Sequence, residues 1–107
     1  MEFYYHTVDR DVLVIKADGG IDSHNADQFL EKLGAMIDAG VTKIIVDCTA
    51  LRYISSYGIG VLVRLHKKLA QRGGQVRLAA VDSAVFKVLR LVRLEHLFHS
   101  YPTVEDA

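Results

Sequence analysis

Two adjacent serines, Ser55 and Ser56, lie in the segment YISSYGIG at residues 53–60 and are the side chains whose type could support nucleophilic chemistry. Asp22 and Asp47 add carboxylates, but a serine nucleophile also needs a general base within hydrogen-bonding reach. Nothing in the spacing of the five histidines brings one of them to Ser56; they are His6, His24, His66, His96 and His99. We therefore predict a protein that is not an enzyme.

Gly58 and Gly60 in the same segment raise the question of a nucleotide site, because they follow a strand-like run and open a helix. The segment lacks both the third glycine of the dinucleotide motif and a Gly-Lys-Ser/Thr ending. Close packing of a helix on a sheet is the simpler explanation. His96 and His99 have a spacing that one helical face could use for a metal, but no cysteine or carboxylate cluster accompanies them. We predict no metal site and no cofactor.

A helix start needs only one capping hydroxyl, and residue chemistry alone favours Ser56 as the N-cap. A phosphate on this serine would add about −1.5 to −2 charges where backbone N–H groups lack partners. The favourable dipole contribution is only about 0.3–1 kcal/mol. The same charge inside a packed interface, or beside an acidic patch such as Asp22 and Asp47, would cost more. Phosphorylation here is therefore expected to release a partner with little change of fold.

Hydrophobic periodicity predicts the elements that must position this segment in the first half of the chain. Two short strands joined by a polar turn come first, then a glycine pair that breaks the pattern, then a helix ended by a glycine. The residues are strands 3–8 and 12–17, the turn 9–11, the glycines Gly19 and Gly20, and a helix capped by Asp22 and Ser23 that ends at Gly40.

The second half begins with a strand at residues 43–48 that is apolar on both faces at its centre, which is typical of a central strand in parallel pairing. A loop, a second helix, another strand and a third helix follow, and the tail is predicted to hold a short strand and the first turn of a helix. The residues are loop 49–54, helix 56–71 with Ile59, Leu62, Val63, His66 and Leu69 buried, strand 75–81, a helix from Asp82, and strand 94–98.

This order predicts one α/β domain over residues 1–107, with a mixed, mostly parallel sheet of about four to five strands and about four helices. Loops at the carboxyl ends of parallel strands gather at one edge of the sheet. We therefore expect Asp22, Asp47 and the segment 53–60 to converge there.

The composition restricts the partners of this domain. Thirteen basic and thirteen acidic residues give a formal net charge of zero without long runs of one sign, so no nucleic-acid partner is predicted. The single Cys48 cannot form an internal disulfide and is expected to be a small buried hydrophobe. The start MEFYYHTVDR lacks the apolar region of a signal peptide, and no apolar run approaches about 20 residues. We expect a cytoplasmic protein without direct membrane insertion.

Residues 45–62, IVDCTALRYISSYGIGVL, resemble the signature of the STAS domain, the family of bacterial anti-sigma-factor antagonists. Residues 20–22 resemble the family's Gly-x-Leu-Asp before its first helix, and residues 98–107 resemble its closing segment. The resemblance thus extends nearly end to end. In the family's usual pattern, Ile-Asp-Ser-Ser/Thr-Gly-Leu-Gly, Ser56 aligns with the phosphorylated serine. Ser55 stands where many members have Asp, and Tyr57 where a small residue is usual.

The resemblance implies that the unphosphorylated domain binds an anti-sigma factor with serine kinase activity and frees a sigma factor. Phosphorylation of Ser56 would lower that affinity, and a protein phosphatase would restore it. The implied phosphorylation pocket comprises Asp22, Asp47, Ser55, Tyr57 and Gly58, and the implied partner-binding residues are Tyr57, Ile59 and Gly60.

Ser55 and Tyr57 also motivate an alternative interpretation within the same family. In it, the chain is a phosphorylation-independent STAS subunit of a signalling scaffold or of a membrane lipid-transport ATPase complex. Association with scaffold or transporter subunits in the absence of any kinase would distinguish this interpretation from the first.

Overall fold

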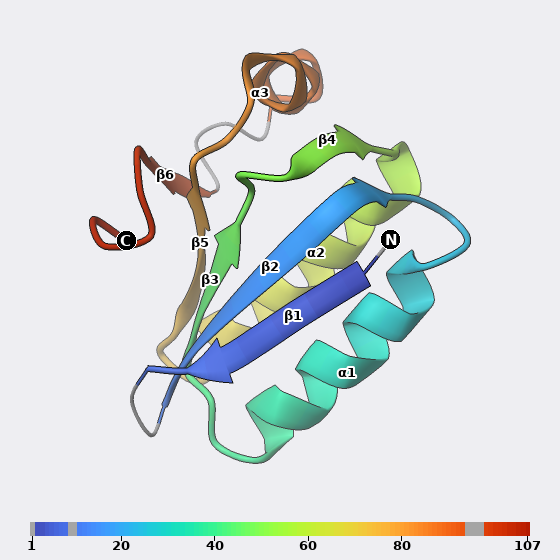
Figure 1. Ribbon diagram of the computed structural model, residues 1–107. Coiled ribbons are helices and arrows are strands. Elements are labelled where there is room, and N and C mark those ends of the chain that lie inside the picture. Colours follow the sequence, from blue (N-terminus) through green and yellow to red (C-terminus); the bar gives the residue numbers. More distant parts are fainter. Residues whose placement is uncertain (1, 9–10, 94–97) are drawn as a thin grey trace.

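The computed structural model describes residues 2–8, 11–93 and 98–107 (Figure 1). The elements are β1 (Glu2–Thr7), β2 (Val12–Ile21), α1 (Ala26–Asp38), β3 (Lys43–Asp47), β4 (Leu51–Ile54), α2 (Ser56–Ala70), β5 (Gln75–Ala79), α3 (Ser83–Leu91) and β6 (His99–Tyr101). Residues 94–97 of the strand predicted at 94–98, and residues 9–10 of the turn predicted at 9–11, lie outside the described residues.

The sheet confirms the predicted fold class and adds a strand. Its order is β1-β2-β3-β5-β6, with β4 paired beside the end of β2, and every pairing except β1 with β2 is parallel. The six strands found in the described residues exceed the predicted four to five. In the described part of the chain there are three helices, because residues 102–106 form turns where the first turn of a fourth helix was expected.

Strand β2 continues through the glycine pair that was predicted to end it. Gly19 adopts φ +100°, and the register shifts between Gly19 and Gly20, as in a β-bulge. The strand can therefore leave β3 and pair its last residues with β4, which the sequence had suggested to be loop. A side chain at Gly20 would meet the Tyr53 ring at 2.8 Å, so this glycine is needed for the contact with β4.

Helices α1 and α2 cover one face of the sheet (Figure 1). Their buried positions recur at helical spacing; on α2 they are Gly58, Ile59, Val61, Leu62, Leu65 and Leu69. Val63 and His66, which were expected to be buried, are only partly covered. On the opposite face of the sheet, Val14, Ile45 and Ala79 form a smaller cluster.

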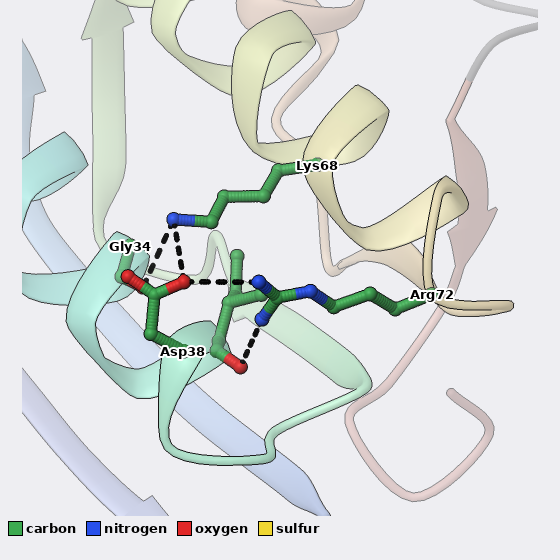
Figure 2. Close-up of polar contacts among 5 residues, drawn as sticks. Gly34, Asp38, Lys68 and Arg72 are labelled. Atoms are coloured by element: carbon green, nitrogen blue, oxygen red, sulfur yellow. Dashed lines mark hydrogen bonds and ion pairs between the residues drawn. The ribbon is translucent and has the colours of Figure 1, made fainter.

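An ion-pair cluster joins the carboxyl-terminal ends of α1 and α2 (Figure 2). The Asp38 carboxylate contacts Lys68 Nζ at 3.0 Å and Arg72 Nη2 at 3.1 Å, and Arg72 Nη1 donates to the Ile37 carbonyl at 2.7 Å. Hydrogen bonds from Lys68 and then Arg72 hold the pKa of Asp38 below its usual value. The cluster thus fixes the two helices side by side.

Candidate functional site

The segment YISSYGIG connects β4 to α2 at the end of β2. Ile21 pairs with Ile54, and the Ser55 N–H donates to the Ile21 carbonyl at 2.8 Å. A backbone contact between strands therefore fixes the residue at which the chain turns into the helix.

Ser55, and not Ser56, is the N-cap of α2. Its backbone is extended (φ −80°, ψ 166°), and its Oγ accepts a hydrogen bond from the Gly58 N–H at 3.0 Å. The sequence-based assignment of the cap to Ser56 was therefore wrong. The bond to Ile21 holds Ser55 in the extended conformation that an N-cap requires, so the first helical residue is Ser56.

Ser56 is exposed, and no hydrogen bond within the described part of the chain involves its hydroxyl. It lines a shallow surface cavity of about 190 Å³ together with Tyr57, Gly60, Val61 and Arg64. Gly60 leaves this cavity open, since a Cβ built on it would have no atom within 4 Å. The Ser56 hydroxyl is therefore accessible from solvent.

Gly58 and Ile59 have their roles on the opposite, buried side of the helix. A Cβ at Gly58 would lie 2.8 Å from the Ile21 carbonyl oxygen and from Ile21 Cγ2, so the helix can approach the end of β2 only with glycine here. Ile59 is 5% exposed and belongs to the core. Its side chain is thus not available at the surface where the resemblance had placed a partner contact, whereas Tyr57 and Gly60 are exposed.

Tyr57 joins α2 to α1 next to Ser56. Its hydroxyl donates a hydrogen bond to the Asp27 carboxylate in the first turn of α1, and the side chain is 43% exposed. The hydrogen bond to Asp27 is the main cause that raises the pKa of Tyr57, and the charge of Arg64 acts in the opposite direction. Sequence reasoning missed Asp27, because only the packing of the two helices brings it to this site.

Asp22 lies beside the segment, directly after Ile21, and is half-buried. Its carboxylate accepts the His24 N–H at 2.8 Å, and its backbone N–H donates to Asn25 Oδ1 at 3.0 Å. It does not cap α1, which begins at Ala26 after Asn25. Asp22 therefore shapes the turn between β2 and α1, and it directly follows Ile21, whose carbonyl accepts the Ser55 N–H.

Asp47 lies apart from the other predicted pocket residues. Asp47 is paired with Lys16 on β2. Lys16 precedes Ile21 by five residues, and this separation corresponds to about 16 Å along the strand. Its carboxylate accepts hydrogen bonds from the Thr49 N–H (3.0 Å) and hydroxyl. The structure thus brings Asp22 to the segment, while Asp47 stabilises the turn after β3.

The remaining sequence candidates offer little chemistry. Cys48 is buried, and burial raises its thiol pKa to about 12, so the thiol stays protonated. Within residues 2–8, 11–93 and 98–107, no three His, Cys, Asp or Glu residues are grouped as metal ligands; His96 lies outside these ranges. None of the helices in the described residues combines the length and the apolarity that spanning a membrane would require.

Comparison with known proteins places this geometry in a family. A family model described as the STAS domain matches residues 6–107. An anti-sigma F factor antagonist of Lysinibacillus sphaericus is 30% identical over 91 residues, covering 84% of this chain and 78% of that protein. One of Paenibacillus polymyxa is 26% identical over 98 residues, covering 91% and 81%.

A solved structure agrees with this match. The anti-sigma factor antagonist SpoIIAA in its unphosphorylated form is 26% identical to this chain, with a TM-score of 0.88 and coverage of 98% of this chain and 91% of that one. Each of these relatives is named as an anti-sigma factor antagonist, and a family of non-enzymatic regulators agrees with the prediction from the sequence. The matched family model, the identities and the shared fold lead to one conclusion: this chain belongs to the STAS domain family of anti-sigma factor antagonists.

Proposed function

We propose that this protein is an anti-sigma-factor antagonist that binds an anti-sigma factor with serine kinase activity and is switched off by phosphorylation of Ser56. Binding would release a sigma factor, and a protein phosphatase would reset the switch. The names of the relatives support the class of partner. The choice of residue rests on the different contacts of the two serines. Ser55 caps the helix, whereas Ser56 has an exposed hydroxyl that none of the described residues hydrogen-bonds.

The position of Ser56 suits a phosphate that changes binding without unfolding the domain. As the first residue of α2, it lies where backbone N–H groups have no partner within the helix, and negative charge is favoured there. The modification adds about −1.5 to −2 charges. Exposed Tyr57 and Gly60 line the same cavity, so the phosphate would occupy the surface offered to the partner. We therefore expect loss of affinity with retention of the fold.

The direct test is to incubate the protein with the kinase anti-sigma factor and ATP and to map the phosphate by mass spectrometry. Phosphate on Ser56 is expected, and binding of the kinase with phosphate at another residue would exclude Ser56 as the acceptor. Ser56→Ala should retain kinase binding, and Ser56→Glu should weaken it because its charge lies in the interface.

Ser83 provides a matched control for the charge introduced by Ser56→Glu. It is the first residue of α3, is exposed, and follows an N-cap, Asp82, whose carboxylate accepts the Ala84 N–H at 2.7 Å. Ser83→Glu therefore adds the same charge at the same helical position in another part of the surface. Equal kinase affinity for the Ser56→Glu and Ser83→Glu variants would argue against a switch at residues 53–60.

A phosphorylation-independent subunit of a signalling scaffold or of a membrane lipid-transport ATPase complex is the second candidate. Exposed aromatic side chains near Ser56 favour it, because Tyr53 and Tyr57 are 55% and 43% exposed and offer contact area that needs no phosphate. Native pull-down decides between the two. Recovery of scaffold or transporter subunits without a kinase, unaffected by Ser56→Glu, would favour the second candidate.

A further inference from the structure

Ser56, Gly60 and Arg64 lie four residues apart along α2 and line one cavity. Residues at this spacing share a helical face, and eight residues correspond to about 12 Å along the axis. Helical side chains incline toward the N-terminus, so the Arg64 side chain is long enough to reach back over Gly60 toward Ser56 in a suitable rotamer. The cavity is therefore a path from the arginine to the serine hydroxyl.

Gly60 keeps this path open. No atom lies within 4 Å of the position that a Cβ would take, so packing does not require glycine there. This contrasts with Gly58, two residues earlier, where a Cβ would collide with Ile21 at 2.8 Å. Glycine is unfavourable in the interior of a helix, and at Gly60 its visible effect is the space between Ser56 and Arg64.

Arg64 is available for a new partner. Within the described residues it takes part in no hydrogen bond or ion pair, whereas Lys68 and Arg72 on the same helix are bound to Asp38. The Asp27 carboxylate, close by on α1, already accepts the Tyr57 hydroxyl. A guanidinium group binds phosphate oxygens through two parallel N–H donors, which makes phosphate a suitable ligand for this side chain.

We propose that Arg64 captures the phosphate of phosphorylated Ser56 across the cavity over Gly60. This inference rests on the proposed function, in which Ser56 is the acceptor. Capture would hold the phosphate against α2 beside Tyr57, and it would remove the exposed positive charge of Arg64 from the surface that meets the partner. The contacts of Arg64 would thus depend on whether Ser56 is phosphorylated.

The test installs phosphoserine at position 56 of the full chain during translation, so that no kinase is needed, and follows its second ionisation by ³¹P NMR. An adjacent guanidinium favours the dianion. Arg64→Gln should therefore raise the titration midpoint by about 0.2–0.7 pH unit, the equivalent of an exposed pair. Arg64→Lys should restore part of the effect, and Gly60→Leu, which fills the path, should raise the midpoint as Arg64→Gln does.

Lys67→Gln is the matched control, because Lys67 is exposed on the same helix but does not line the cavity. Lys67→Gln should shift the titration midpoint by only a small fraction of the shift caused by Arg64→Gln. Equal midpoints for the parent and Arg64→Gln, or equal shifts for Arg64→Gln and Lys67→Gln, would overturn the capture. Failure of a kinase to label Ser56 would instead contradict the proposed function, so the two failures are distinguishable.

Discussion

The Tyr57 hydroxyl on α2 donates a hydrogen bond to the Asp27 carboxylate on α1, thirty residues earlier in the chain. Lys68 contacts Asp38 with the same separation, at the other end of the two helices. The parallel helices are therefore in register and joined at both ends. One of these connections lies in the first turn of α2, next to Ser56, so the geometry of the candidate site depends on α1.

The two serines should differ in their effect on stability. Ser55→Ala removes the capping bond to the Gly58 N–H and should lower the free energy of unfolding by about 1 kcal/mol. Ser56→Ala removes an exposed hydroxyl without a bonded partner and should change it by less than about 0.5 kcal/mol. Urea unfolding of both variants measures this difference. Equal losses would contradict the assignment of Ser55 as the cap.

The two glycines of α2 should respond in opposite directions to alanine. Gly58→Ala places a Cβ 2.8 Å from Ile21 and should destabilise the protein by about 1–3 kcal/mol. Gly60→Ala adds a Cβ in open space and should stabilise the helix by about 0.5–1 kcal/mol. Thermal and urea unfolding of the pair give the sign directly. Destabilisation by Gly60→Ala would indicate that residue 60 is packed.

The Tyr57–Asp27 bond predicts a loss of stability at alkaline pH. The bond to Asp27 raises the pKa of Tyr57 above 10.0, so its contribution is fully present below the pKa of an unfolded tyrosine and is lost as the pH rises through the folded value. Ultraviolet titration of tyrosinate, with Tyr57→Phe used to identify the signal, should show a lower midpoint in Asp27→Asn. An unchanged midpoint would mean that the bond does not persist in solution.

The Asp38 cluster predicts a loss of stability at acidic pH. Hydrogen bonds from Lys68 and Arg72 lower the pKa of Asp38 below 3.8, so its contribution is present above that value and is lost as the pH falls through the folded value. Asp38→Asn should therefore be less stable than the parent in urea at neutral pH and equally stable well below pH 3.8.

Glu31→Gln is the control for the Asp38 experiment. Glu31 is exposed on the same helix and makes no ion pair with any described residue, so its removal should change stability little at either pH. High salt should weaken the Asp38 effect through screening. A difference between the parent and Asp38→Asn that persists in strong acid would assign the effect to packing instead of charge.

The sequence alone was enough for the fold class and for most element positions, since the periods of strands and helices are local properties of the chain. The run that forms β3 is apolar on both faces, and it correctly predicted a central parallel strand. Asp82 was likewise recognised as the start of α3. The same locality explains the misses. Gly19 and Gly20 were interpreted as the end of the strand, although the strand bends there and continues to pair with β4.

Only the tertiary structure decided which serine caps the helix and which acidic residues lie near it. Ser55 becomes the cap because its N–H is bound by Ile21 on another strand. The strand register leaves Asp47 beside Lys16, while the packing of α1 on α2 brings in Asp27, which no local pattern marks. The sequence thus determines which residue types are present at the site. Their roles follow from contacts between segments some thirty residues apart, which local periodicity cannot predict.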